Sequence, residues 1–154
     1  MYWADEIAEQ VIAKYPNEEV YTCASGISPS GVVHMGNLRE VVTSWFVTKA
    51  LRDKGKKVRF IFSWDNFDGL RKVPAGIDES FGKYVSAPLD RIPDPFGCHE
   101  SWAKHFQQPF IDSLKELGVE VEHIFQADRY SSGAYTEGMI TAVQKRKEVY
   151  DGSC

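Results

Sequence analysis

Residues 20–31 read Val20-Tyr21-Thr22-Cys23-Ala24-Ser25-Gly26-Ile27-Ser28-Pro29-Ser30-Gly31. The first five favour β structure and predict a short strand, and the Gly, Pro and Ser residues after them predict a loop. Apolar residues then recur three and four positions apart up to Gly55, which predicts a helix with a buried stripe facing a sheet. Residues 58–64 are apolar nearly throughout, as in a central parallel strand. This strand–helix–strand unit predicts an α/β fold with a parallel sheet, of the nucleotide-binding kind.

Apolar spacing in the rest of the chain predicts three more helices, over residues 3–14, 101–117 and 136–149. Thr136 is the expected N-cap of the last helix. Pro109 lies inside the middle one and is expected to bend or break it, because proline removes a backbone donor. Gly118 suits the end of that helix, and a strand is predicted over residues 119–125.

Residues from about 70 to 100 are rich in Pro and Gly and have weak periodicity, so we expect an irregular insertion that helps to line a cleft. No repeat, low-complexity tract or linker divides the 154 residues, and a single domain is expected. The amino terminus does not read as a secretory signal, and no apolar run is long enough to span a membrane. We therefore expect a soluble, cytoplasmic protein without a membrane segment.

The cysteines, Cys23, Cys98 and Cys154, are widely spaced and odd in number, which argues against a disulfide framework. Cys98 is followed by His99, with His105 six positions further on, but no second cysteine lies nearby. We therefore expect no protein-bound metal in this chain and leave the role of these three residues open. The net charge of −4 would not attract nucleic acid, so any RNA contact must come from local basic patches.

The loop after the first strand lies where open α/β sheets bind ligands. The following helix begins near Gly36 and Asn37, and its free N–H groups and positive dipole end suit phosphate oxygens. Gly31 and Gly36 allow a ligand to approach the backbone, with His34 and Asn37 as flanking donors. A plainer interpretation makes His34 a surface residue, Asn37 an N-cap and the glycines turn residues. The loop lacks the glycine patterns of dinucleotide-binding and P-loop proteins.

The segment Pro29-Ser30-Gly31-Val32-Val33-His34-Met35-Gly36-Asn37 resembles the HIGH motif of class I aminoacyl-tRNA synthetases, in a His-x-Gly-Asn form. Together with residues 25–31, 62–74 and 88–101, it resembles ordered blocks of the class I lysyl-tRNA synthetases. The resemblance extends from Trp3 to about Tyr150. It implies that residues 1–154 are the first half of a Rossmann-like catalytic domain.

The resemblance also implies a reaction, in which the lysine carboxylate attacks the α-phosphate of ATP, with Mg²⁺ accompanying the nucleotide, and the lysyl group then passes to tRNA-Lys. His34 and Asn37 would be the catalytic residues. The residues implied for ATP binding are Pro29, Ser30, Gly31, His34, Gly36 and Asn37. The residues expected to bind L-lysine are Gly26, Ser28, Asp65 and Asp68.

The two groups of lysine-binding residues have different expected partners. Asp65 and Asp68 are candidates for the α-ammonium, with turn and cap formation as the alternative. Similar glutamyl-type enzymes carry an arginine at the position of Gly26, and a cation there would repel lysine. With glycine at this position, the Gly26 backbone carbonyl and the Ser28 hydroxyl could both accept hydrogen bonds from the ε-ammonium of lysine. The alternative for Gly26 is a turn residue that needs positive φ. Arg71 and Lys72 are either phosphate contacts or surface charges.

The family resemblance also implies parts that this sequence lacks, namely a second half of the fold with a KMSKS loop and an anticodon-binding region. We therefore expect the isolated chain to be incompetent in catalysis, and a monomer. A non-catalytic module that binds a nucleotide or amino acid is the alternative. A fragment of a glutamyl-type or other class I synthetase is a third interpretation, which the Trp64-Asp65-Asn66-Phe67-Asp68 block disfavours.

Overall fold

A parallel three-stranded sheet forms the centre of the computed structural model, which describes residues 2–152. The strands are β1 (Tyr21–Ile27), β2 (Val58–Trp64) and β3 (Glu122–Phe125), in the order β1-β2-β3. The predicted α/β fold with a parallel sheet is confirmed. β1 is longer than the predicted strand, because Ser25, Gly26 and Ile27 continue the ladder against the end of β2.

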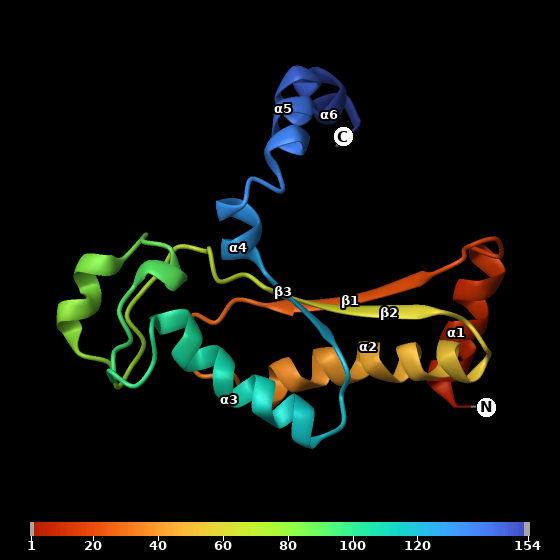
Figure 1. Cartoon of the computed structure of the whole chain (residues 1–154), viewed down its shortest axis with the longest axis horizontal. Helices are drawn as coiled ribbons and strands as arrows, with labels where there is room; N and C mark the ends of the chain where they lie inside the picture. The colour runs from red at the N-terminus through yellow and green to blue at the C-terminus, as the bar shows by residue number, and fades with distance from the viewer. Residues whose placement is uncertain (1, 153–154) are drawn as a thin grey trace.

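Helices α2 (Met35–Asp53) and α3 (Trp102–Glu116) cover one face of the sheet (Figure 1). Phe60, Phe62 and Trp64 of β2 are buried against these helices, whereas the residues between them are partly exposed. The prediction of a central parallel strand is confirmed, since β2 pairs in parallel with β1 and with β3. In the part of the chain that is described, helices cover only one of its faces. The buried members of this core are Val41, Trp45, Phe60, Phe62, Trp64, Phe110, Leu114 and Val119.

Helix α1 (Trp3–Lys14) matches its predicted bounds and closes the amino-terminal end of the molecule. Its small residues Ala4 and Ala8 are fully buried and pack with Tyr21 and Leu51 in a second apolar cluster. Small side chains let the helix approach α2 and β1 closely. This cluster lies at the end of the sheet opposite to the loop that follows β1 (Figure 1).

Residues between β2 and α3 form the expected irregular insertion, with two short 3-10 helices, η1 (Glu79–Tyr84) and η2 (Leu89–Arg91). An isolated antiparallel bridge pairs Gly69, near the start of the insertion, with Pro88, just before η2. The insertion has an apolar cluster of its own with the start of α3, whose buried members are Leu70, Leu89, Ile92, Trp102, Ala103 and Phe106.

Helix α3 continues through Pro109 without a break, contrary to one of the two expected outcomes. Proline removes only one backbone donor, and Phe106 and Phe110 on either side remain packed in the two cores. The hydroxyl of Ser113 donates to the Pro109 carbonyl at 2.8 Å. Gly118 has a φ of 67° just after the helix, so its predicted role at this helix end is confirmed.

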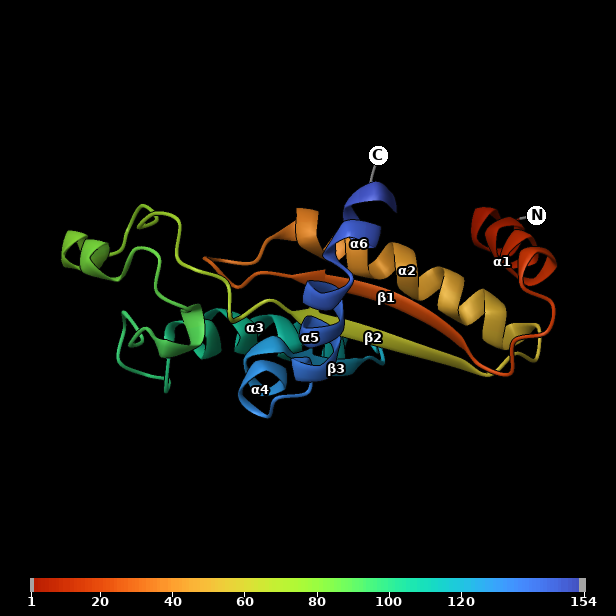
Figure 2. The ribbon, with the colours of Figure 1, turned by 90° about the horizontal axis from the view of Figure 1, so that it is seen from above.

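The carboxyl-terminal part differs most from the prediction. Helix α4 (Gln126–Ser131), which no sequence pattern indicated, follows β3 directly. The predicted last helix is divided into α5 (Thr136–Gln144) and α6 (Arg146–Gly152), and Tyr135, not Thr136, is the N-cap. Helices α5 and α6 project from the sheet and have no buried residue (Figures 1 and 2). Within residues 2–152, no helix has the length and apolar character to cross a membrane.

Candidate nucleotide and amino-acid site

The loop after β1 and the first turn of α2 are joined by a capping box. His34 is the N-cap, and its Nδ1 accepts a hydrogen bond from the Gly36 N–H at 3.1 Å. The Asn37 side-chain oxygen accepts one from the His34 N–H at 3.1 Å. The plainer interpretation is thus partly correct, although the cap is His34 and Asn37 is the third helical residue. The capping box holds both side chains in fixed positions beside the loop.

Gly36 is required for this arrangement. A Cβ atom at position 36 would lie 2.9 Å from Cε1 and 3.0 Å from Nδ1 of His34, closer than side chains tolerate. Any other residue would therefore push the imidazole away from its cap position. This reason for a glycine is packing against His34, which differs from the predicted reason, the approach of a ligand to the backbone.

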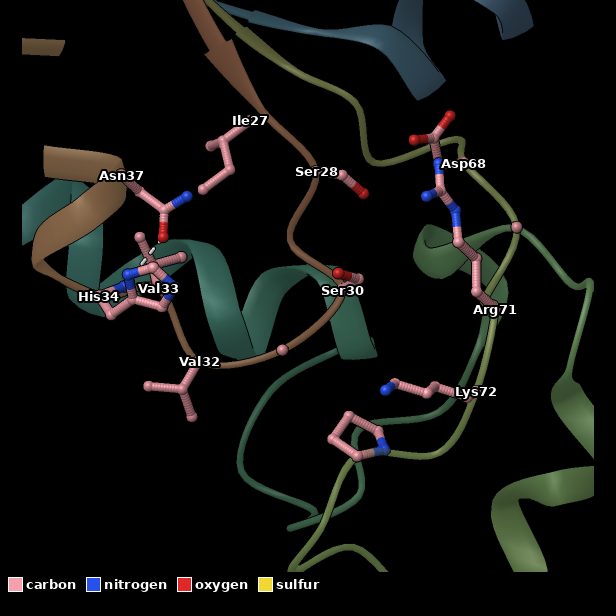
Figure 3. Close-up of a pocket in the computed structure, with 13 residues that line it drawn as sticks. Ile27, Ser28, Ser30, Val32, Val33, His34, Asn37, Asp68, Arg71 and Lys72 are labelled. Atoms are coloured by element: carbon pink, nitrogen blue, oxygen red, sulfur yellow. Dashed lines mark hydrogen bonds between the residues drawn. The ribbon is translucent and has the colours of Figure 1, made fainter. Parts of the chain in front are cut away.

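A cavity of about 390 Å³, the loop cavity, lies between this capped loop and the start of the insertion. Figure 3 shows Ser28, Ser30, His34 and Asn37 on one side and Asp68, Arg71 and Lys72 on the other. Of the residues predicted to bind ATP, Ser30, Gly31, His34 and Asn37 line this cavity. Pro29 and Gly36 do not, and the side chain of Pro29 is fully buried.

The polar groups around the loop cavity suit an anion. The amino-terminal end of α2, with the positive end of its dipole, lies at this cavity, which His34 and Asn37 line. Arg71 and Lys72 add two cationic side chains from the opposite wall. These two residues, left open by the sequence, therefore lie across the cavity from the amino-terminal end of α2, where their charges would attract an anion.

A second cavity of about 360 Å³, the carboxylate cavity, is lined by Asp65, Phe67, Asp68, Gln126 and Tyr130. Asp68 also lines the loop cavity, so the two cavities adjoin. The rings of Phe67 and Tyr130 stack at 5.0 Å between centroids. Carboxylates and aromatic faces both attract ammonium groups, so this cavity suits a cationic ligand.

A chain of hydrogen bonds fixes the inner wall of the carboxylate cavity. The Ser63 hydroxyl donates to Asp65 Oδ1 at 3.1 Å and accepts from Gln126 Nε2 at 2.7 Å. The Tyr135 hydroxyl donates to Gln126 Oε1 at 2.6 Å. Residues from β2, α4 and the loop after α4 therefore position Asp65 together.

Sequence reasoning missed Gln126 and Tyr130, which come from α4. Their only sequence signal was the place of Gln126 directly after the predicted strand 119–125, at the carboxyl end of a parallel strand. Recognising it would have required knowing that β3 pairs with β2, with Trp64 opposite Phe125. That register brings Gln126 next to Ser63.

Gly26 is the predicted lysine-binding residue that the structure separates from the cavities. It lies inside β1, opposite Ser63, and lines neither cavity. A Cβ at this position would lie 2.8 Å from the Ser63 carbonyl oxygen. Gly26 is not among the described glycines with positive φ, so the alternative interpretation as a positive-φ turn residue is wrong. The close approach of β2 is what requires glycine here.

Donor atoms that could hold a metal gather at a separate place, where the insertion meets α3. Asp94, Cys98, His99 and His105 each place one donor atom within 4.8 Å of the others. Burial alone would raise the pKa of Asp94, but N–H donors from Phe96, His99 and Cys98 outweigh it and hold that pKa well below its usual range. The expectation of no metal rested on the missing second cysteine and did not consider Asp94.

Comparison with known proteins gives one consistent family. The family model for tRNA synthetases class I (K) matches residues 1–151. The chain is 42% identical to a lysine–tRNA ligase of Pyrococcus horikoshii over 151 residues, which are 98% of this chain and 29% of that protein. A lysine–tRNA ligase of Treponema pallidum is 37% identical over 97% of this chain and 29% of its own length.

A lysine–tRNA ligase of Streptomyces coelicolor is 42% identical over 96% of this chain and 27% of its own length. The chain thus spans less than a third of the length of the curated relatives that it matches. The family match covers nearly the whole of this chain, and it includes the capped loop and both cavities. The chain therefore belongs to the class I tRNA synthetases of the lysine (K) type.

Proposed function

We propose that this chain is the amino-terminal part of the catalytic domain of a lysine–tRNA ligase, with ATP in the loop cavity and L-lysine in the carboxylate cavity. One observation supports this division above all. Two adjoining cavities share Asp68, and one is lined by cations and a helix amino terminus while the other is lined by carboxylates and aromatic rings. A phosphate-bearing and an ammonium-bearing substrate would therefore meet at Asp68.

In this arrangement, the phosphates of ATP lie between the first turn of α2 and the side chains of Arg71 and Lys72. His34 and Asn37 are the proposed catalytic residues, because the capping box leaves both side chains at the cavity wall. Ser30 and Gly31 would contact the nucleotide directly. Pro29, whose side chain is buried, would act by fixing the shape of the loop, and Gly36 by leaving room for the His34 ring.

For lysine, Asp65 and Asp68 are the proposed acceptors of the α-ammonium. The Ser63–Gln126–Tyr135 chain positions Asp65, which makes it the more rigid of the two. Ser28 lines the loop cavity and remains a proposed acceptor for the ε-ammonium. Gly26 could take part only through its backbone, because it has no space for a side chain.

The reaction proposed for the complete enzyme forms a bond between a lysine carboxylate oxygen and the α-phosphorus of ATP, and pyrophosphate leaves. The lysyl group then passes to tRNA-Lys, and AMP is released. The carboxylate is already a nucleophile, so the protein must position the reactants and neutralise phosphate charge rather than remove a proton. Mg²⁺ bound with ATP would assist that neutralisation.

The remaining parts of the proposal concern the whole enzyme. The second half of the nucleotide fold and the anticodon-binding region would come from the rest of a longer protein, of which residues 1–154 form the first part of the catalytic domain. The enzyme would be cytoplasmic and monomeric. The competing proposal is a non-catalytic module that binds ATP or lysine without consuming them.

The test of the two-cavity assignment is calorimetric titration of the chain with ATP and with L-lysine. Asp65→Asn should weaken lysine by roughly tenfold or more and leave ATP nearly unchanged, since hydrogen bonds to charged groups contribute about 1.5–3 kcal/mol. Lys72→Ala should have the opposite pattern. Asp112→Asn and Lys83→Ala remove matching charges outside both cavities and should change neither affinity. Equal loss of both ligands in Asp65→Asn would make Asp65 a scaffold residue.

A further inference from the structure

Asn66 is a buried amide in the loop after β2, and the lysine and ATP proposals assign it no role. Its neighbours Asp65 and Phe67 both line the carboxylate cavity. Asn66 instead lines a separate cavity of about 200 Å³, to which η2, α3 and α4 also contribute, and it is only 5% exposed. The Asn66 side chain therefore lies outside the proposed lysine site, although both of its neighbours belong to that site.

The Asn66 side chain caps helix α4 from a distant part of the chain. The first N–H groups of a helix have no partner within the helix, and a side chain at the N-cap usually accepts one of them. The N-cap of α4 is Phe125, which has no side-chain acceptor. Asn66 Oδ1 accepts the N–H of Ala127, the second residue of α4, in a buried hydrogen bond of 2.8 Å. Asn66 thus replaces the missing local cap, although 61 positions separate the two residues.

The backbone around Asn66 is fixed by hydrogen bonds from η2. The Asn66 carbonyl oxygen accepts the N–H of Asp90 at 3.0 Å. The Asp68 carbonyl oxygen accepts the N–H of Leu89, also at 3.0 Å. The backbone of the loop after β2 is therefore held by η2, while the Asn66 amide holds α4. The loop and α4 consequently form one connected unit.

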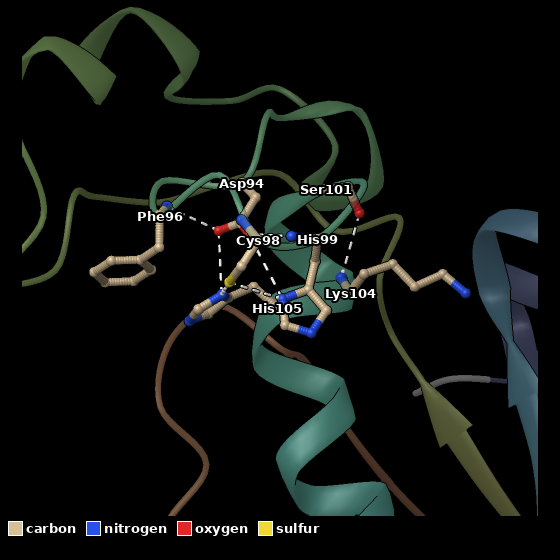
Figure 4. A network of polar contacts seen from close by, with 7 residues as sticks. All are labelled: Asp94, Phe96, Cys98, His99, Ser101, Lys104 and His105. Atoms are coloured by element: carbon tan, nitrogen blue, oxygen red, sulfur yellow. Dashed lines mark hydrogen bonds and ion pairs between the residues drawn. The ribbon is translucent and has the colours of Figure 1, made fainter.

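A weaker contact reaches the start of α4 from α3. Lys104 Nζ lies 5.5 Å from the centroid of the Phe125 ring. Figure 4 shows Lys104 at the start of α3, where its N–H donates to the Ser101 hydroxyl at 3.3 Å and its side chain extends away from the helix. Lys104 is exposed, so water screens this cation–π contact. The buried bond between Asn66 and Ala127 is therefore the stronger restraint on α4.

The position of α4 matters because two of its residues line the carboxylate cavity. Gln126 immediately precedes Ala127, and Tyr130 lies about one turn further along the helix. Gln126 Nε2 donates to the Ser63 hydroxyl, which donates to Asp65. A shift of α4 would therefore move Gln126 and Tyr130 relative to Asp65.

We propose that Asn66 is a positioning residue for lysine binding, which places Gln126 and Tyr130 in the carboxylate cavity by capping α4 at Ala127. This inference rests on the proposed function, which assigns L-lysine to that cavity. Loss of the cap should lower the affinity for lysine and spare that for ATP. The reason is that the loop cavity, as the described residues line it, includes no residue of α4.

A neutral acceptor suits this position better than a carboxylate. Asp90 and Asp128 line the same small cavity as Asn66. Burial raises the pKa of Asp90, and the charge of Asp128 acts in the same direction, whereas the charge of Arg91 opposes the rise. An aspartate at position 66 would add a third carboxylate to this cavity. Asn66→Asp should therefore keep the cap, but not at its full strength.

Amide hydrogen exchange at Ala127, followed by NMR, tests the cap itself. We expect this amide to exchange slowly in the wild-type chain and at least about tenfold faster in Asn66→Ala. Gln108→Ala removes an exposed amide side chain of α3, which bonds to Asp112, and should leave the Ala127 exchange rate unchanged. Equal protection of Ala127 in Asn66→Ala and the wild type would overturn the cap. Fast exchange of this amide in the wild-type chain would overturn it without any substitution.

Calorimetric titration with L-lysine and with ATP tests the positioning role. Asn66→Ala should weaken lysine about threefold to tenfold, the range of one neutral hydrogen bond, and leave ATP unchanged. Asn66→Asp should lose less lysine affinity than Asn66→Ala, and Gln108→Ala should lose none. Equal losses of lysine and ATP affinity in Asn66→Ala, or equal losses of lysine affinity in the two Asn66 variants, would contradict a positioning role.

The variant Asp65→Asn separates this inference from the proposed function. If Asp65→Asn weakens lysine and Asn66→Ala does not, the lysine site stands and the positioning role of Asn66 is wrong. If neither variant weakens lysine although Asn66→Ala loses the protection of the Ala127 amide, the assignment of lysine to the carboxylate cavity fails, and the positioning role fails with it.

Discussion

At the scale of single residues, one imidazole connects the shape of the loop with the proposed nucleotide site. His34 ends the loop and caps α2 through Nδ1, while its ring lines the loop cavity. Gly36 makes room for that ring, because a Cβ would lie 2.9 Å from it. The His-x-Gly-Asn pattern is therefore one interlocked unit, in which the glycine and Asn37 hold the histidine in place.

Gly36→Ala should consequently act on ATP through His34. We expect the affinity for ATP to fall severalfold to about tenfold, the range of a single neutral hydrogen bond. Stability should change by less than about 1 kcal/mol, because alanine's higher helix propensity offsets the lost cap. Calorimetric ATP titration and urea unfolding measure the two effects.

The matched control for this variant is Gly82→Ala. Gly82 lies in the 3-10 helix η1, and a Cβ there would meet nothing within 4 Å. It should leave ATP affinity unchanged. If Gly36→Ala bound ATP as tightly as wild type, the proposed role of the His34 ring at the nucleotide would have to be abandoned.

The sequence indicated which regions of the chain meet at the candidate site better than it indicated the contacts that each residue makes there. The motif around His34 and the carboxylates after β2 lie beside two adjoining cavities, as their chain positions after strand ends predicted. Gly26 shows the limit of such reasoning, since its requirement for glycine comes from the Ser63 carbonyl on a neighbouring strand. Asp94 shows the same limit, since only the folded chain brings its carboxylate close to Cys98 and His105. Contacts between distant segments leave no local periodicity to detect.

At the scale of elements, the contact between β2 and β3 contains a group that should make stability depend on pH. The Trp64 indole donates from Nε1 to His123 Nδ1 at 3.1 Å, and the two rings stack. This bond requires a neutral imidazole. Burial lowers the pKa of His123 below its usual value. Between the folded and unfolded pKa values the unfolded chain binds more protons, so stability increases with pH there.

We therefore expect the contribution of His123 to be fully present above about pH 6.5, the usual pKa in an unfolded chain. It should be lost progressively as the pH falls toward the lower pKa of the folded state. The measurement is the urea midpoint of the chain from pH 8 to pH 5. His123→Gln keeps an acceptor near Trp64 but does not titrate, so the difference between the two profiles should shrink toward acid pH. Parallel profiles would exclude His123 as the source.

The same region explains which elements the sequence could indicate. Helices α1 and α2 and strand β2 have their own apolar pattern, and their predicted positions are close to those observed. Helix α4 is only six residues long and begins immediately after β3, so periodicity had no length over which to appear. Pro109 predicted a possible break that the helix does not have. The free energy lost with one backbone hydrogen bond is smaller than the free energy gained by burying Phe106 and Phe110.

At the scale of the whole molecule, the second face of the sheet is largely uncovered by the described residues. The projecting helices α5 and α6 expose large apolar side chains, with Met139 50%, Ile140 51% and Val143 65% exposed. Ile140→Ser should therefore change the free energy of unfolding by less than about 0.5 kcal/mol. Leu114→Ala, at a core position 1% exposed, should cost about 2–5 kcal/mol. Chemical unfolding distinguishes the two variants. A large loss of unfolding free energy in Ile140→Ser would mean that the apolar side chains of α5 are covered in solution.

The last prediction concerns catalysis by the isolated chain. The described walls of the loop cavity contribute only Arg71 and Lys72 as lysine or arginine side chains, and no stretch of the sequence matches a KMSKS loop. Each missing charge-assisted contact to the leaving pyrophosphate should cost about 1.5–3 kcal/mol, or roughly one to two decades in rate. Lysine-dependent exchange of labelled pyrophosphate into ATP should therefore be slight or absent.

Two comparisons make that experiment decisive. The Pyrococcus horikoshii lysine–tRNA ligase is the positive control, and a chimera that carries residues 1–151 of this chain in place of its matching segment should regain exchange. His34→Ala in the chimera should lower the exchange rate again, because the ring at the cavity wall is lost while the rest of the site is present. Exchange by the isolated chain at the rate of the complete ligase would show that residues 1–154 suffice for lysine activation. The proposal that the rest of a longer protein completes the active site would then be untenable.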